Sequence, residues 1–289
     1  MHILLTGGSG DLGHILSRQL DQRGDIPVRL DVRPPLVPRG IQITGSILDR
    51  HVLQDSMQAV DTVVHIAAWH GIHWVTKQKD AYDFWDLNVT GTFNVFEAAV
   101  RAGIRRVIYI SSSSVDEWPD VYGATKVLGE EIARTYAARH RMNVIVLRPR
   151  AFIPHWNRAT YTSFVEFARW FWGGAVHIDD VCQAVMQSID LVQHSDLPEP
   201  PVLAIDGAYD YTDADMATWD NAGPGSTFRR YYAQYEDMVL RYGLDPAARP
   251  TKLDLTETRR LLGYLPHYSL RNLLADLAQY GTDGPPAPE

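Results

Sequence analysis

A tyrosine and a lysine stand four positions apart near the middle of the chain, at Tyr122 and Lys126. Residues four apart share one face of a helix, so the phenol and the ammonium can lie side by side. A phenol with a pKa of about 10 is a poor base at neutral pH, and a neighbouring positive charge stabilises the phenolate and lowers that pKa. Such a pair could remove a proton from a substrate hydroxyl.

Four consecutive serines, residues 111–114, come shortly before this pair and directly after an apolar run that is predicted to be a strand. A serine hydroxyl at the end of that strand could hold the substrate oxygen from which Tyr122 takes the proton. The Tyr-x-x-x-Lys spacing is common by chance. Its position after a fifth predicted strand gives it weight, because doubly wound sheets bind ligands at the carboxyl ends of their strands.

A second feature lies at the start of the chain, where Thr6-Gly7-Gly8-Ser9-Gly10-Asp11-Leu12-Gly13 follows an apolar run. Glycines at 7, 10 and 13 allow a tight turn, close approach of the backbone to a pyrophosphate, and close packing of the following helix. The first amides of that helix would point at the phosphates. The predicted dinucleotide contacts here are Gly7, Gly10, Asp11, Leu12 and Gly13.

The type of dinucleotide is indicated by Asp31, which ends the second predicted strand about 20 residues beyond the glycines. Its carboxylate can accept hydrogen bonds from the hydroxyls of the adenosine ribose and would repel a 2′-phosphate. This favours NAD over NADP. Arg33 points the other way, because it could turn toward such a phosphate.

These residues must be positioned by a fold that alternates strands and helices. Val- and Ile-rich runs without polar alternation favour a parallel sheet covered on both faces, and right-handed strand–helix–strand units give a doubly wound α/β sheet, the Rossmann architecture. Predicted strands cover residues 3–6, 28–31, 41–44, 62–67, 106–111, 143–148 and 202–205, and predicted helices cover 12–23, 49–59, 82–101, 122–141, 179–191, 228–242 and 270–280.

The alternation stops after Pro149. We expect residues 1–149 to form a NAD-binding Rossmann domain that carries the serine, tyrosine and lysine. Residues 150–289 are expected to form a small, mostly helical substrate lobe, interleaved with elements at about 176–206 that return to the Rossmann core. Its first stretch, 150–175, is aromatic and is predicted to be irregular.

The composition excludes several classes of protein. Of 289 residues, 45% are hydrophobic and 21% charged, as in ordinary globular proteins, and a net charge of −8 argues against non-specific binding to nucleic acid. No uncharged apolar run approaches the roughly 18 residues that span a bilayer. The single cysteine, Cys182, fits a reducing compartment, and the chain begins with a predicted core strand. We therefore expect a cytoplasmic protein with no membrane or nucleic-acid partner.

With these motifs in view, the sequence resembles the extended short-chain dehydrogenase/reductase family, the NAD-dependent epimerase/dehydratase group. The resemblance runs through most of the chain. Besides the glycine turn, Asp31 and the Tyr122/Lys126 pair, it is carried by His65-Ile66-Ala67-Ala68, Asn88-Val89-Thr90-Gly91-Thr92, Leu147-Arg148-Pro149 and Val176-His177-Ile178-Asp179-Asp180-Val181.

The resemblance implies Ser112 as the catalytic serine, with Ser113 as the alternative. It also implies further contacts with the cofactor. The adenine would lie along Ser46 and Ile47, Ala67 and Ala68 would line the nicotinamide half, Asn88 would support the active-site helix, and Ile110, Tyr122 and Lys126 would complete the set.

Three departures from the family pattern narrow the chemistry. The positions of the dehydratases' Asp-Glu pair hold Ser113 and Ser114, which disfavours dehydration. The stretch between Ser112 and Tyr122 is short, and Arg148 to His177 spans 29 positions, where nucleotide-sugar enzymes generally place a longer segment. A compact lobe suits a free sugar or sugar acid, and in this the chain is more loosely similar to uronate dehydrogenases, which oxidise free hexuronic acids.

Candidate substrate contacts follow from residue type. Aromatic faces suit sugar rings and an arginine suits a carboxylate, so the predicted contacts are Trp69, His70, Ser113 and Arg150. The alternative for the tryptophans is a place in the core. His70 and His73 could suggest a metal pair, but with no third obvious ligand we predict no metal.

Three functions remain open from the sequence. The leading one is a NAD-dependent oxidoreductase that transfers hydride at a hydroxyl or carbonyl carbon of a sugar-like molecule, with the tyrosine as general base. A NAD-dependent epimerase for sugars or nucleotide sugars is the second, and a non-catalytic dinucleotide sensor the third. The resemblance also implies a homodimer formed through helices 82–101 and 122–141.

Overall fold

The structure is a computed structural model that describes residues 1–116 and 120–288, and it divides into two compact units. Unit 1 comprises Met1–Arg150, Val181–Ile205 and Leu255–Tyr264. Unit 2 comprises Ala151–Asp180, Asp206–Asp254 and Leu265–Glu289. Each unit has its own hydrophobic core.

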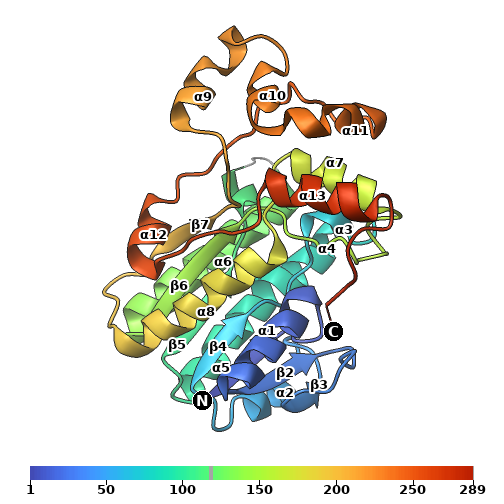
Figure 1. The fold of residues 1–289 in the computed structure, drawn as a ribbon. Coiled ribbons are helices and arrows are strands. Elements are labelled where there is room, and N and C mark those ends of the chain that lie inside the picture. Colours follow the sequence, from blue (N-terminus) through green and yellow to red (C-terminus); the bar gives the residue numbers. More distant parts are fainter. Residues whose placement is uncertain (117–119, 289) are drawn as a thin grey trace. The chain divides into compact units, whose positions relative to one another are not determined.

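Unit 1 is built on a seven-stranded sheet in which every strand pair is parallel and the order is β3-β2-β1-β4-β5-β6-β7 (Figure 1). The strand order reverses between β1 and β4, which creates the crevice where doubly wound folds bind ligands. This confirms the predicted fold class. The strands are β1 (His2–Thr6), β2 (Ile26–Asp31), β3 (Ile41–Thr44), β4 (Thr62–His65), β5 (Arg106–Ile110), β6 (Asn143–Pro149) and β7 (Val202–Ile205).

Helices cover both faces of this sheet. On one face α2, α5 and α6 bury apolar side chains against the strands, and α1 and α8 lie on the other face (Figure 1). Helix α6 approaches β5 closely because it carries a glycine at 129, where a Cβ would overlap the hydroxyl of Tyr109. The helices of this unit are α1 (Asp11–Arg23), α2 (Arg50–Ser56), α3 (Gly71–Val75), α4 (Ala81–Phe84), α5 (Gly91–Arg101), α6 (Val121–His140), most of α8 (Ile178–His194) and α12 (Thr256–Leu262).

Residues 255–264 also belong to unit 1, although only the elements at about 176–206 were predicted to return to this core. The reason is a side-chain contact. Thr258 on α12 is buried and its hydroxyl donates to the carbonyl of Ala204 on β7 at 2.7 Å. Such a contact joins segments 54 positions apart, and no local pattern in the sequence announces it.

Unit 2 is helical and has an aromatic core that includes Tyr161, Phe164, Phe167, Phe228 and Tyr232. The prediction of an irregular stretch at 150–175 is wrong in part, because helix α7 forms there. The hydroxyl of Ser163 caps α7 by accepting from the Glu166 amide at 3.3 Å. The helices are α7 (Phe164–Trp172), α9 (Asp213–Thr218), α10 (Ser226–Tyr232), α11 (Glu236–Arg241) and α13 (Leu270–Tyr280).

The single helix predicted over 228–242 is also wrong. The chain forms α10, a 3-10 turn at Ala233–Tyr235 and then α11. Tyr232 leaves the helical region with a φ of −141°, while its buried ring keeps its hydroxyl bonded to Asp210 at 2.5 Å. Among the described helices, none is long and apolar enough to cross a membrane.

Candidate active site

The glycine turn joins β1 to α1 with little space for side chains. Gly7 has a φ of +71°, which favours glycine, and its amide donates to the carbonyl of Leu30 at 2.8 Å. A Cβ on Gly13 would lie 2.6 Å from the Cα of Gly8. Gly10 caps α1 without a side chain, so the helix presents its first amides at Asp11 and Leu12 beside a bare turn. This arrangement fits a pyrophosphate.

Asp31 is held against this turn at the end of β2. Its two carboxylate oxygens accept from the amides of Ser9 and Arg33, each at 3.0 Å. The side chain of Arg33 is exposed, with its Nε 3.8 Å from the Asp31 carboxylate. The Arg33 side chain therefore lies near the aspartate that ends β2, and a 2′-phosphate placed there would meet the Asp31 carboxylate as well.

The next two predicted contacts follow β3. The amide of Gly45 donates to the Asp31 carbonyl at 2.9 Å, which brings Ser46 and Ile47 close to the end of β2. Ile47 is buried, and its carbonyl accepts from the side chain of Asn94 on α5 at 3.1 Å. The backbone around Ser46 and Ile47 is thus fixed to α5.

The end of β4 is shaped by the hydroxyl of Thr6 at the end of β1. This oxygen accepts from the amides of Ile66 and Ala67 at 3.1 and 3.3 Å. The strand was predicted to run to Ala67 but ends at His65. The Ile66 amide still reaches the Thr6 carbonyl of β1, at 3.3 Å, whereas the Ala67 amide bonds to the Thr6 hydroxyl. Ala67 and Ala68 consequently leave the sheet at its carboxyl edge, beside Gly7, whose Cβ would lie 3.0 Å from the Ala67 backbone.

Asn88 ties this loop to the active-site helix. Its Oδ1 accepts from the Trp69 amide at 2.7 Å, and its Nδ2 donates to the Trp69 carbonyl at 3.0 Å and to the Thr125 hydroxyl at 3.1 Å. Asn88 lies in a π-helical turn, Trp85–Thr90, between α4 and α5. Such turns are frequent at functional sites.

His65, at the end of β4, is completely buried and bridges two hydroxyls. Its Nδ1 lies 2.8 Å from the Thr6 Oγ1 and its Nε2 lies 3.0 Å from the Thr92 Oγ1. The Thr92 hydroxyl donates to the Asn88 carbonyl at 2.6 Å, so it must accept from the histidine. Nε2 therefore carries the proton. Burial lowers the pKa of His65 to about 3, which keeps the ring neutral.

Tyr122 and Lys126 lie in the first turns of α6, whose start is capped by the Asp120 carboxylate accepting from the Gly123 amide at 3.1 Å. The Lys126 Nζ donates to the Ile110 carbonyl at the end of β5 at 2.8 Å and lies 5.9 Å from the centre of the Tyr122 ring. The hydroxyl of Ser112 is near enough to Tyr122 for hydrogen bonding to lower the pKa of the phenol. The three predicted residues therefore converge at the carboxyl edge of β5, and the serine that reaches Tyr122 is Ser112.

The direction of the Tyr122 pKa differs from the sequence expectation. Burial raises it to about 12, and the hydrogen bond with Ser112 opposes this rise. Burial also lowers the pKa of Lys126 to about 7, with the carboxylate of Glu130 acting in the opposite sense. Desolvation disfavours the charged form of both groups and is the largest effect on each pKa.

Residues 3–160 match the model of the "NAD dependent epimerase/dehydratase family". The match covers more than half of the chain. The chain belongs to this family. Its description identifies NAD as the cofactor of the family, in agreement with the glycine turn and Asp31.

The curated proteins to which the chain is similar have names that describe different activities. The chain is 29% identical over 184 residues to the 3 beta-hydroxysteroid dehydrogenase/Delta 5-->4-isomerase of Mycobacterium tuberculosis, covering 56% of this chain and 49% of that protein. It is 26% identical over 170 residues to the uronate dehydrogenase of Pseudomonas putida, covering 53% and 61%. The matches thus span about half the length of these curated relatives.

A solved structure extends the likeness of the fold to nearly the whole chain. The UDP-glucuronic acid 4-epimerase from Bacillus cereus, in complex with UDP-glucuronic acid and NAD, superposes with a TM-score of 0.71 over 97% of this chain and 98% of that one. The sequences are 20% identical. This likeness concerns the fold of the family.

The four predicted substrate contacts do not form one cluster as the serine, tyrosine and lysine do. His70 is half-buried and caps the start of α3, where desolvation and the nearby Lys126 lower its pKa to about 3. The ring of Trp69 is half-buried and lies under the Lys79 ammonium at 4.4 Å. Ser113 begins the 3-10 turn Ser113–Asp116, and the Arg150 amide donates to the Ile205 carbonyl at 3.0 Å. His70 therefore lies near the Lys126 side of the site.

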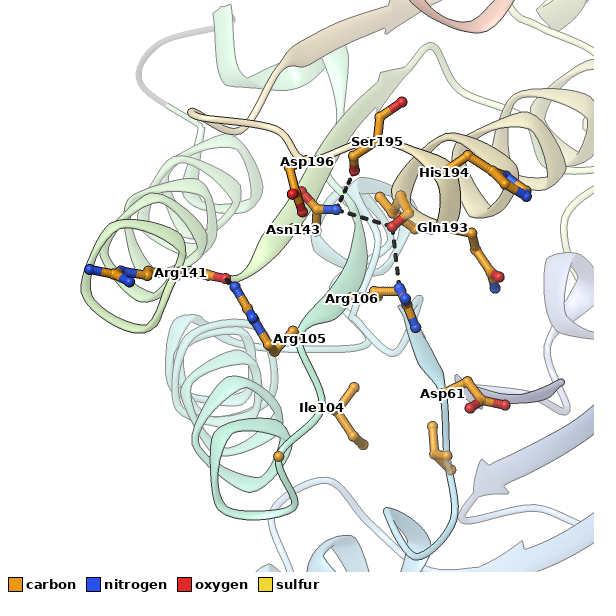
Figure 2. A pocket seen from close by; sticks show the side chains of 13 residues that line it. Asp61, Ile104, Arg105, Arg106, Arg141, Asn143, Gln193, His194, Ser195 and Asp196 are labelled. Atoms are coloured by element: carbon orange, nitrogen blue, oxygen red, sulfur yellow. Dashed lines mark hydrogen bonds between the residues drawn. The ribbon is translucent and has the colours of Figure 1, made fainter.

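A cavity of about 430 Å³ lies in unit 1, away from these residues. Figure 2 shows the thirteen residues that line it. They come from the amino ends of β5 and β6, from the residues just before β4, β5 and β6, and from the end of α8 with the two residues after it. Arg105 donates twice to the Arg141 carbonyl beyond α6, at 2.7 and 3.0 Å, and Arg106 donates to the Val192 carbonyl of α8 at 3.3 Å. Both arginines donate to carbonyls at or near the negative ends of helices, and this structural role accounts for their presence in the cavity.

Several residues that build the site had no role assigned to them from the sequence, although four of them stand in the motifs quoted above. They are Thr6, Gly8, Arg29, His65, Thr92 and Glu130. Arg29 is buried on β2 and donates to the carbonyls of Gly8 and Val37, both at 2.8 Å, so it fixes the glycine turn from below. A Cβ on Gly8 would in turn lie 2.8 Å from the Arg29 Cβ. The available signal was an arginine inside an otherwise apolar strand.

Proposed function

We propose that this protein is a NAD-dependent oxidoreductase that transfers hydride at a hydroxyl or carbonyl carbon of a sugar-like small molecule. The observation that carries the proposal is the convergence of Ser112, Tyr122 and Lys126 at the carboxyl edge of β5. The glycine turn and Asp31 are the residues proposed to hold the pyrophosphate and the adenosine ribose.

In this proposal the bound NAD supplies the hydride acceptor. The Ser112 hydroxyl orients the substrate oxygen, and Tyr122 takes the proton from it as general base. Because burial holds the pKa of Tyr122 near 12, the phenolate needs a neighbouring positive charge. The proposed source of this charge is the Lys126 ammonium, 5.9 Å from the centre of the ring.

A free sugar or sugar acid is the proposed substrate class. The short segment between Arg148 and His177 and the similarity to a uronate dehydrogenase support it. Unit 2 is the proposed substrate lobe. The second candidate is an epimerase acting on sugars or nucleotide sugars, which the family description supports equally.

A substrate screen tests the proposal. Purified protein with NAD or NADP is presented with free sugars, uronic acids, nucleotide sugars and a 3β-hydroxysteroid, and formation of the reduced cofactor is followed by absorbance. We expect reduction of NAD with a sugar or sugar acid, and little with NADP because of Asp31. An epimerase would convert its sugar without net reduction. Activity confined to nucleotide sugars or to the steroid would overturn the substrate class.

We also propose that the protein is a homodimer formed through α5 and α6. Both helices expose apolar side chains, with Phe93 44%, Val127 38% and Leu128 37% accessible. A charge at Phe93 should separate the dimer, because a buried interface tolerates an unpaired charge poorly. Sedimentation velocity should show Phe93→Glu as a monomer and Val202→Glu, a change at an exposed residue of β7, as a dimer. A monomeric unaltered protein would refute the proposal.

A further inference from the structure

Lys126 is surrounded by titratable groups of which few are charged. On its own helix it faces Tyr122 and Glu130, and from β5 the ring of Tyr109, whose centre lies 5.3 Å from the Nζ. From β4 and the loop after it come His65 and His70, and burial lowers the pKa of each to about 3, so both are neutral. Glu130 is therefore the negative charge that acts on the buried ammonium.

Glu130 is itself buried, one helical turn beyond Lys126. Its Oε1 accepts from the Ser111 hydroxyl at 2.5 Å and from the Arg148 Nε at 2.8 Å, and its Oε2 accepts from the Arg148 Nη2 at 2.7 Å. One carboxylate thus joins three segments: the active-site helix, the end of β5 and the end of β6.

The hydrogen bond between Glu130 and Ser111 matters because Ser111 lies between two residues that contact the Tyr122/Lys126 pair. Ser111 stands between Ile110, whose carbonyl binds the Lys126 ammonium, and Ser112, whose side chain bonds to Tyr122. Glu130 holds the side chain of the residue between them. Arg148 also approaches Asp116 of the serine turn, with 3.8 Å between its Nη1 and the carboxylate.

We infer that Glu130, paired with Arg148, is a positioning residue of the active site: it fixes residues 110–112 against α6 and presents its negative charge one helical turn from the Lys126 ammonium. Its value to the reaction rests on the proposed function. The charge effect itself is a property of the folded chain and is measured without substrate or cofactor.

The physical basis is a balance between burial and charge. Removing Lys126 from water lowers its pKa to about 7, so its protonation at neutral pH depends on every remaining charge nearby. Glu130 raises this pKa, and Arg148 limits the effect by neutralising Glu130. Removing the Glu130 carboxylate should therefore lower the pKa of Lys126, and removing the Arg148 guanidinium should raise it.

The chain makes this measurable because it contains only four lysines, Lys77, Lys79, Lys126 and Lys252. The ε-CH₂ signals of protein labelled with ¹³C-lysine are followed by NMR across the pH range, and the Lys126 signal is assigned from its loss in Lys126→Arg. We expect Glu130→Gln to lower the midpoint of Lys126 by about one pH unit, and Arg148→Gln to raise it. The matched control is Glu131→Gln, an exposed neighbour that pairs with Arg134, which should leave the midpoint unchanged.

Breaking a buried ion pair can unfold a protein, so a second variant accompanies the single ones. Glu130→Leu/Arg148→Met replaces both charges by apolar groups of similar volume, and it should fold with a Lys126 midpoint below that of the unaltered protein. If Glu130 had a purely structural role, the two single variants would not shift the Lys126 midpoint in opposite directions. Unmoved midpoints in the folded variants, or shifts in the same direction for both single variants, would overturn the inference. If the substrate screen finds no turnover, the proposed function is refuted. The Lys126 midpoints still decide the inference about Glu130.

Discussion

Tyr122→Phe is expected to lower the turnover of the substrate found in the screen by at least about 100-fold, while the protein stays folded and still binds NAD. The change removes only the phenolic oxygen. General bases contribute about 10²- to 10⁴-fold to rates. Ser112 would remain to hold the substrate oxygen, so the loss should appear mainly in kcat rather than in KM. Steady-state kinetics together with titration of NAD against the protein's fluorescence separate these quantities.

A second tyrosine on the same helix provides the control. Tyr136 donates its hydroxyl to Glu97 at 2.9 Å, four turns from Tyr122, and Tyr136→Phe should leave kcat close to that of the unaltered protein. Full activity in Tyr122→Phe would exclude this phenol as the base and would leave Ser112 or another group as the proton acceptor.

Gly13→Ala is expected to weaken both the fold and the cofactor site. The new methyl group would lie 2.6 to 2.7 Å from the Gly8 Cα, carbonyl carbon and oxygen, so the turn and α1 would have to separate. Overpacking of this kind costs about 1–3 kcal/mol. A displaced helix start would also misdirect the amides that face the pyrophosphate, and we expect NAD affinity to fall at least about tenfold. Thermal unfolding and NAD titration measure the two effects.

Gly10→Ala is the matched comparison within the same turn. A Cβ there meets only the Gly7 carbonyl oxygen, at 3.3 Å, so the free energy of unfolding should change much less than in Gly13→Ala. A Gly13→Ala protein that melts and binds NAD like the unaltered chain would show that the turn relaxes without cost, and the packing argument would fail.

Local pattern was enough for much of the architecture. The parallel sheet, the glycine turn at Gly7 to Gly13 and the Tyr122/Lys126 spacing follow from hydrophobic runs and short motifs, because strand period, turn geometry and helical spacing are properties of neighbouring residues. The same reasoning failed at 228–242. There the apolar pattern favours one helix, and the buried ring of Tyr232, bonded to Asp210 some 22 positions earlier, interrupts it.

The sequence by itself therefore determined the fold class and, through the glycine turn and Asp31, the cofactor type, and it named the residues that we propose to bear the chemistry. The tertiary structure decided the tautomer of His65 and the direction in which the pKa of Tyr122 is shifted, and it brought Ser112 near Tyr122. It also joined Glu130 to Arg148, residues 18 positions apart on a helix and a strand. These features depend on burial and on side chains that distant segments bring together, and no local spacing encodes either.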